Sequence, residues 1–152
     1  MKQIKFYGVL FVLLMSFASC NNDDDDGCEG EDPGPNEAFF GVFNQDGVSL
    51  IGVGNTYDPS EIILSNSSLD FPLSQVTFFN SDDIFMRFSY DSMETGIDYL
   101  LMLNSTEVDV INLVFSFQET DCFTIKRIEE FKINDMVIVA TDPGEHEFRI
   151  VK

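Results

Sequence analysis

The residues able to carry out acid–base chemistry are one histidine and many carboxylates. The chain has 27 Asp and Glu residues but a single histidine, His146, between Glu145 and Glu147. Neighbouring carboxylates favour the charged form of an imidazole. Alternation in a strand would place His146 on one face with Phe148 and Ile150, so a partly buried histidine at a sheet rim is the simpler interpretation. A catalytic base is the alternative.

The carboxylates suggest two further kinds of site. A pair separated by ~5–10 Å can hydrolyse glycosides, but a sequence does not show distances between strands. Asp82 with Asp83, and Asp58 with Glu61, lie in expected loops that offer oxygen atoms to calcium. Neither pair matches the D-x-[DN]-x-[DN]-G loop, and a solvated acidic loop is the simpler interpretation. We expect no catalytic residue, no metal site and no cofactor.

The aromatic composition bears on carbohydrate binding. The chain has no Trp and four Tyr residues, although Trp and Tyr are the usual aromatic anchors of binding surfaces. Tyr57 lies beside an expected turn and is the tyrosine that we expect to be an exposed contact. Tyr90 and Tyr99 fall in apolar segments and are expected in the core. A glycan remains one alternative for the ligand.

The first nineteen residues have the pattern of a secretory signal peptide. Lys2 and Lys5 precede an apolar run over residues 6–17, and small residues follow it. The run is shorter than the ~20 apolar residues that a membrane-spanning helix needs. Cleavage after Ala18 would release a soluble protein, whereas cleavage before Cys20 would leave that cysteine at the new N-terminus.

The residues around Cys20 favour the second cleavage. The stretch "FASC" resembles the lipobox of bacterial lipoproteins, in which the cysteine is lipidated; Ala18, Ser19 and Cys20 fit, and Phe17 replaces the usual leucine. The stretch "CNNDDDD" resembles the start of surface lipoproteins of the Bacteroidota, in which an acidic run after the cysteine acts as an export signal. In this chain the run comprises Asn21, Asn22, Asp23, Asp24, Asp25 and Asp26.

The resemblance implies a protein anchored to the cell outer membrane and facing the exterior. Lipid attached to Cys20 would hold the chain in the membrane, because each buried CH₂ contributes ~0.8 kcal/mol. The segment from Cys20 to residue 36 would be a flexible tether: its residues 21–36 hold seven acids, three glycines and two prolines. Such a segment buries too little apolar surface to offset the entropy of ordering it.

Two other cysteines belong to the mature chain. Cys28 lies in the tether and Cys122 in the domain, and an exported protein can form disulfides. A bridge between them would close a loop worth up to ~4.7 kcal/mol in the chain-entropy model. Two free thiols are the alternative, because a sequence does not show that the cysteines are near one another.

The net charge excludes some partners. Loss of the leader removes two lysines and no acid, which leaves six basic and 27 acidic residues and a net charge of −21. This charge repels the phosphates of nucleic acids and anionic lipid surfaces. We therefore expect no nucleic acid among the partners, and contact with the membrane only through the lipid.

Residues 37–152 have the pattern of a single all-β domain. Ile111, Leu113, Phe115 and Phe117 alternate with more polar residues, and Ile84, Met86, Phe88 and Tyr90 do the same. Turn sequences separate such runs: "NQDG" at residues 44–47 precedes an expected strand at 48–53, "LNST" lies at 103–106, "ND" at 134–135 and "DPG" at 142–144. Ile125 and Ile128 are three residues apart, so a bulge near Arg127 is needed to turn Phe131 and Ile133 inward.

These patterns predict an antiparallel β-sandwich of about nine strands, with a β-barrel as the alternative. Residues 98–138 also resemble, more loosely, a segment of uncharacterised lipoproteins of the same bacteria, a resemblance that implies no activity. The leading hypothesis is a non-enzymatic binding or accessory domain for an outer-membrane protein or a glycan. The alternatives are a small carboxylate-dependent hydrolase that acts on surface glycans and a purely structural component of the envelope.

Overall fold

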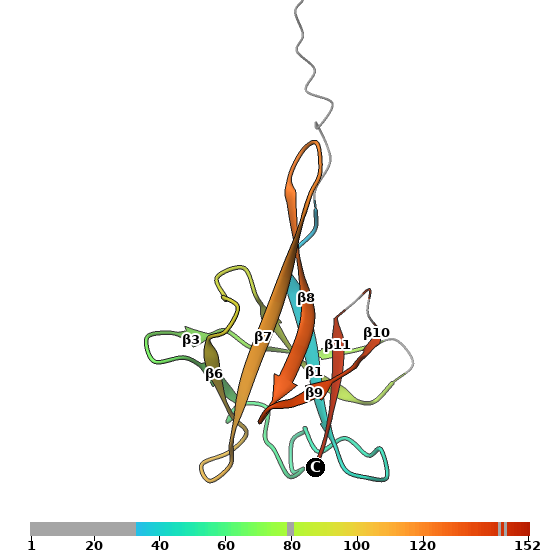
Figure 1. Ribbon diagram of the computed structural model, residues 1–152. Helices are drawn as coiled ribbons and strands as arrows, with labels where there is room; N and C mark the ends of the chain where they lie inside the picture. Colours follow the sequence, from blue (N-terminus) through green and yellow to red (C-terminus); the bar gives the residue numbers. More distant parts are fainter. Residues whose placement is uncertain (1–32, 79–80, 143, 145) are drawn as a thin grey trace, which may run out of the picture. The chain divides into compact units, whose positions relative to one another are not determined.

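The computed structural model describes residues 33–78, 81–142, 144 and 146–152, which form two β-sheets (Figure 1). This part of the chain contains eleven strands and no helix, and thus no helix able to cross a membrane. The "DPG" turn includes residue 143, and Cys20, Asn21–Asp26 and Cys28 precede residue 33. These residues lie outside the described ranges, so what the sequence suggests about them stays a prediction.

The larger sheet is antiparallel throughout and contains the two longest strands of the described chain. Its strand order is β3-β2-β6-β7-β8-β9. Four consecutive strands, β6 to β9, are joined by short turns. Asn104 caps the first turn, Thr120 caps the second, and Asn134–Asp135, both with positive φ, form the third. The strands are β2 Ile63–Ser65, β3 Asp70–Phe71, β6 Asp98–Met102, β7 Val108–Glu119, β8 Thr124–Ile133 and β9 Met136–Ile138.

The smaller sheet combines the first and last described strands. Its order is β10-β11-β1-β5-β4. The pair β1 and β11 is parallel, whereas the other neighbours are antiparallel. The parallel pair departs from the purely antiparallel sandwich predicted from the sequence. The strands are β1 Glu37–Phe43, β4 Ser74–Thr77, β5 Ile84–Ser89, β10 Ala140–Asp142 and β11 Glu147–Val151.

The architecture confirms the prediction of an all-β, sandwich-like fold. Each sheet keeps two edge strands, β3 and β9 in one and β4 and β10 in the other, so the sheets do not close into the alternative barrel. About nine strands were expected and eleven are found; four of the eleven are only two or three residues long. One expected strand, at residues 48–53, is wrong. Only single bridges form there, because Gly52 and Gly54 interrupt the extended backbone with positive φ angles.

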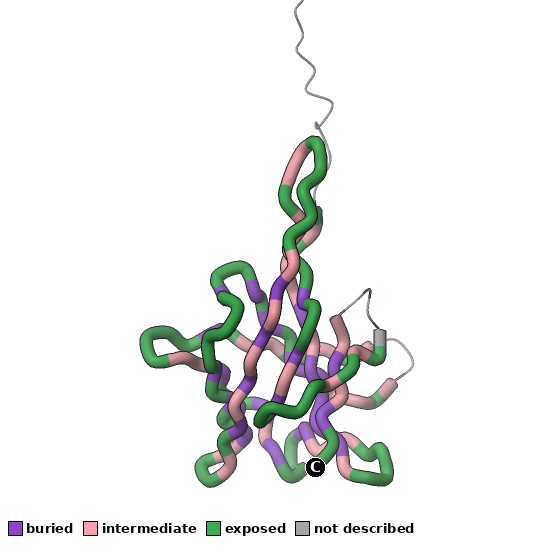
Figure 2. Tube along the Cα trace, viewed as in Figure 1, coloured by how far each residue is buried: buried purple, intermediate pink, exposed green. Residues whose placement is uncertain are grey.

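The core lies between the sheets and follows the predicted alternation (Figure 2). On β7, Ile111 and Leu113 are fully buried and Phe115 is 8% exposed. Tyr90 and Tyr99 are buried as predicted. Phe117 continues the alternation but is 64% exposed, because the end of β7 extends beyond the body of the domain (Figure 1).

A bulge on β8 keeps both halves of that strand facing the core. Val114 pairs with Glu130 and Phe115 with Ile128, so Glu129 is the additional residue. The bulge lies two residues beyond the expected position at Arg127. Its effect is the predicted one, because Ile128, Phe131 and Ile133 are all buried.

The outer face of the smaller sheet carries its own apolar cluster. Phe43 and Phe85 are each 1% exposed but lie outside the main core, with their ring centroids 5.7 Å apart. Phe78 packs edge-on to Phe85, and the Arg149 guanidinium lies 4.0 Å from the centre of the Phe43 ring. A Cβ atom on Gly41 would lie 2.6 Å from the same ring, so the residue at this position must lack a side chain.

Candidate functional site

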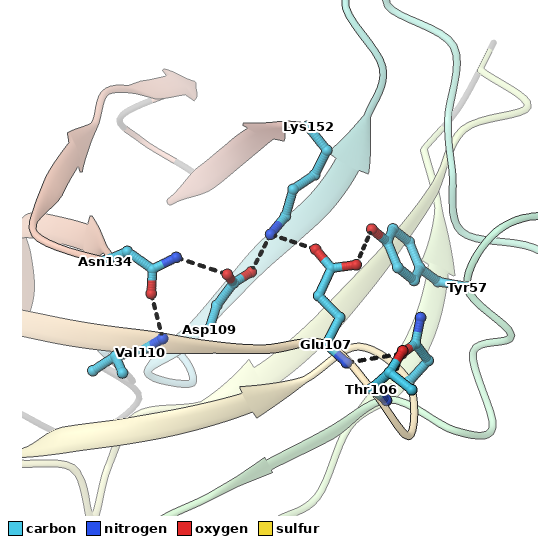
Figure 3. Close-up of polar contacts among 8 residues, drawn as sticks. Tyr57, Thr106, Glu107, Asp109, Val110, Asn134 and Lys152 are labelled. Atoms are coloured by element: carbon cyan, nitrogen blue, oxygen red, sulfur yellow. Dashed lines mark hydrogen bonds and ion pairs between the residues drawn. The ribbon is translucent and has the colours of Figure 1, made fainter.

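Two carboxylates meet one lysine where the two sheets approach each other (Figure 3). The Lys152 ammonium lies 2.6 Å from Asp109 and 2.8 Å from Glu107. Tyr57 donates its hydroxyl proton to Glu107 at 2.8 Å, and the Asn134 amide donates to Asp109 at 2.7 Å. These five residues are the Lys152 cluster. Alternation explains the pair of acids, because Asp109 lies on the inward face of β7 and Glu107 just precedes the strand.

The electrostatics of the Lys152 cluster favour its charged state. Hydrogen bonds from Lys152 and Tyr57 lower the pKa of Glu107. Burial acts to lower the pKa of Lys152, but its hydrogen bonds to Asp109 and Glu107 outweigh burial and raise it. Burial, followed by the hydrogen bond to Glu107, raises the pKa of Tyr57 to about 12. Glu107 and Lys152 therefore both stay ionised at neutral pH.

This arrangement is better suited to holding the two sheets together than to catalysis by a pair of carboxylates. A general acid needs a carboxyl group whose pKa is raised, whereas the pKa of Glu107 is lowered. Glu107 and Asp109 also both form ion pairs with the Lys152 ammonium group. None of three surface hollows, of roughly 400–480 Å³, is lined by a residue of the cluster. The cluster ties the residue after β11 to β7 and so joins the two sheets.

Tyr57 was expected to be an exposed contact, and that expectation is wrong. The residue is 3% exposed, and its hydroxyl is bonded to Glu107. Its backbone N–H donates to Leu50 and its carbonyl accepts from Gly52, so residues 50–57 fold over and bury the ring. A tyrosine beside a turn is thus part of the core here, and its polar end is satisfied inside the Lys152 cluster.

His146 lies in a turn, one residue before β11 begins, and has a φ of 49°. It is half-buried at the rim of the sheet, and its ring meets that of Tyr90 edge-on at 5.8 Å. It is therefore not aligned with Phe148 and Ile150 as a strand residue would be. Its position agrees with the simpler interpretation, a histidine at the sheet rim.

Two of the acidic residues considered as calcium ligands have partners within the protein. Asp83 forms an ion pair with Arg149 at 2.6 Å. Asp58 accepts hydrogen bonds from the backbone and side chain of Ser60, which lower its pKa, and Glu61 follows in the same turn. No cluster of three or more His, Cys, Asp or Glu side chains suited to a metal ion occurs among the described residues.

Residues 116–127 form an arm, the part of the β7–β8 hairpin that projects from the body (Figure 1). At its tip, the Thr120 hydroxyl oxygen accepts hydrogen bonds from the backbone N–H groups of Cys122 and Phe123. Cys122 is disulfide-bonded. Cys28 lies outside the described residues, and its pairing with Cys122 stays a prediction.

Two hollows flank the base of the arm on either side of Lys126. One, of about 470 Å³, is lined by Arg127, His146 and the chain segment 33–37 among others. The other, of about 480 Å³, lies between the arm and residues 91–95 and includes Phe117. Lys126 donates to the backbone carbonyls of residues 90, 91 and 93, at 2.8, 3.1 and 2.6 Å. Burial lowers the pKa of this lysine, whose main contacts are structural.

Part of the outer face of the larger sheet is apolar: one row extends over three strands and the next over two, with Ser65 of β2 opposite Leu100. One row places Ile63 opposite Met102 and Met102 opposite Val108, and the next places Leu100 opposite Val110. The exposed fractions of Ile63, Leu100, Met102 and Val108 lie between 37% and 49%. An antiparallel sheet with one face in water normally carries polar residues on that face. These five residues are the outer apolar patch.

Sequence reasoning missed both the Lys152 cluster and the outer apolar patch. The patch had a signal, because valine occupies positions 108, 110 and 114 on the face assigned as polar. No local sequence signal predicts the Lys152 cluster, because its residues are up to 95 positions apart in the sequence. Comparison with protein-family models, with curated proteins and with solved structures finds no match.

Proposed function

We propose that this chain is a lipid-anchored, non-enzymatic binding protein of the outer surface, whose β-sandwich docks a partner protein. Anchoring rests on the lipobox ending at Cys20 and on the acidic run Asn21–Asp26. Docking rests on one structural observation, the outer apolar patch of the larger sheet.

The patch supports docking because its residues are adjacent and in register. Directly opposed side chains on a sheet lie about 5 Å apart, so the two rows make one continuous surface. Contiguous exposed apolar surface on a soluble domain marks an interaction site more often than scattered single residues do. Val53 illustrates the scattered kind: it is 88% exposed in a loop, with no apolar row beside it.

The charge of the domain indicates the partner's chemistry. Seven of the 27 acids lie in residues 21–36, which leaves 20 acids against six basic residues in 37–152. Two copies of such a domain repel each other, whereas a partner with a basic rim is attracted. We therefore assign the patch to a different protein, whose complementary surface is apolar at the centre and rich in Lys and Arg at the edge.

Site-specific photo-crosslinking in living cells tests this assignment. A photoreactive residue at Leu100 should capture a partner whose crosslinked peptide is apolar and flanked by basic residues, with less capture at high salt. The same residue at Val53 is the matched control and should capture nothing specific. Equal capture at both positions, an adduct with twice the mass of the chain, or no adduct at Leu100 would each contradict the proposal. The last outcome would favour a purely structural role.

The hydrolase alternative lacks a supporting observation. It requires two close carboxylates in a cleft, one with a raised pKa. The pair formed by Glu107 and Asp109 shares Lys152 and lines none of the hollows described above. We therefore do not propose an enzymatic activity.

A further inference from the structure

The arm carries a strand edge with which no other described strand pairs. β6 pairs with β7 only as far as Asp98 opposite Asn112. Beyond this point, the chain before β6 makes two more contacts with β7. Gly96 donates its N–H to the Leu113 carbonyl at 3.4 Å, and the Thr95 hydroxyl accepts the Phe115 N–H at 3.0 Å.

Alternation shows which main-chain groups point to this edge. The contacts of Leu113 and Phe115 place the main-chain groups of odd-numbered residues on the β6 side of β7. Val110, in contrast, exchanges hydrogen bonds with Asn134 on the β8 side. The period of a strand is two, so the N–H and C=O of Phe117 and Glu119 also point to the β6 side. None of the described residues pairs with β7 there.

A hollow lies directly beside this edge. It has a volume of about 480 Å³, and residues 91–95 form its wall opposite Phe115 and Phe117. Phe117 is 64% exposed and offers an apolar surface. The three hydrogen bonds from Lys126 to backbone carbonyls hold residues 90–93, and with them one wall of the hollow, against the arm.

Acidic side chains surround the edge. Asp91 and Glu94 belong to the wall of the hollow, and Glu119 and Asp121 lie on the arm above it. Lys126 is the cation that lines this hollow, and its ammonium group donates hydrogen bonds to backbone carbonyls; Arg127, also on the arm, lines the other hollow. The surroundings of the open edge therefore attract positive charge.

An isolated two-stranded ribbon is only marginally stable in water, and an open strand edge is a template for another strand. We propose that the β7 edge at Phe117–Glu119 binds an extended, basic segment of a partner protein as a third strand. A Lys or Arg side chain of that segment enters the hollow beside Glu94 and packs against Phe117. This site lies apart from the outer apolar patch, so it adds to the proposed function and does not depend on it.

Binding of a model peptide to the full mature chain tests the site. The probe is a labelled peptide of alternating lysine and valine, and its control carries N-methyl groups on the amides that would pair with β7. We expect the control to bind about tenfold more weakly, since strand addition depends on main-chain hydrogen bonds. Hydrogen exchange at the amides of Phe117 and Glu119 should slow in the presence of the probe only. Equal affinity of the two peptides would overturn the proposal, because it would indicate diffuse electrostatic attraction.

Two protein variants locate the binding. Glu94→Gln should lower the affinity for the probe peptide about threefold, because it removes one exposed charge pair. Glu61→Gln removes another exposed carboxylate, from a loop outside this hollow, and should leave the affinity unchanged. Phe117→Ala should lower the affinity for the probe peptide. The fold should be unchanged, because the ring is mostly in solvent. Equal effects of the two glutamate variants would contradict the site, while the crosslinking result at Leu100 would stand.

Discussion

The Lys152 ammonium lies 2.6 Å from the carboxylate of Asp109, whose side chain is 5% exposed. Asp109 is the buried charged residue of the described domain. Its other oxygen accepts a hydrogen bond from Asn134, so both oxygens are satisfied. A buried carboxylate with this geometry depends on its partner, because an uncompensated charge in the interior is costly.

Removal of that partner should destabilise the domain. We expect Lys152→Met to lower the free energy of unfolding by about 2 kcal/mol. This loss is smaller than that for a fully buried ion pair, because Lys152 is partly exposed. Adding Asp109→Asn should recover part of the loss. Urea denaturation measures both effects. Lys132→Met removes a more exposed pair with Glu130 and serves as the control, with an expected change below about 0.5 kcal/mol.

The cluster also predicts how stability depends on pH. The pKa values of Tyr57 and Lys152 are raised in the folded protein. Their contribution is therefore complete below the pKa values of the unfolded chain, near 10, and is lost as pH rises through the folded values. Urea midpoints should fall as the pH rises from about 10 towards about 12, and Tyr57→Phe should make this fall shallower. A midpoint that is flat over this range would disagree with the cluster.

Acid should act through Glu107. Its pKa is lowered in the folded state, so its contribution is present above the unfolded value of about 4.3 and is lost as pH falls below it. Glu107→Gln should therefore be less sensitive than the wild type to acid unfolding. Midpoints of urea unfolding at neutral and acidic pH give the comparison, with Glu61→Gln as the control.

The outer face of the smaller sheet predicts a strict requirement for glycine. Gly41→Ala places a methyl group against the Phe43 ring, which is held by Phe85 and Arg149. We expect a loss of about 1–3 kcal/mol in the free energy of unfolding. In the Phe43→Leu background the same substitution should cost less. Equal costs in the two backgrounds would show that the ring is not the obstacle.

The anchoring part of the proposal has its own test. Metabolic labelling with a fatty acid should mark the wild type and fail to mark Cys20→Ala. Replacing Asp23–Asp26 by alanines should retain the label but reduce cleavage by protease added to intact cells. Label on the Cys20→Ala protein, or unchanged cleavage of the alanine variant, would contradict the corresponding role.

The sequence was informative where local rules decide the structure. Alternation identified the inward faces of β5 and β7, and the Asn134–Asp135 turn and the inward return of Phe131 followed from turn and bulge rules. It was less informative where distant segments meet. The parallel pairing of β1 with β11 has no local signal, and Tyr57 was misplaced because its partner Glu107 is 50 residues away.

The candidate sites show the same division. The acidic surroundings of the arm were visible as composition, but the open edge depends on where β6 stops, and that is set by Thr95 and Gly96. The outer apolar patch was visible only as valines on a face that was assumed to be polar. Its continuity depends on the register between Met102 and Val108, which a single strand does not encode.

The parallel pairing of β1 with β11 also affects when the domain can fold. β1 is the earliest strand of the described chain and lies at the centre of its sheet, yet one of its neighbours is made more than one hundred residues later. Until that neighbour emerges, the middle of the sandwich cannot form, and pairings so distant along the chain are slow. The smaller sheet is therefore completed only after the last described strand has been made.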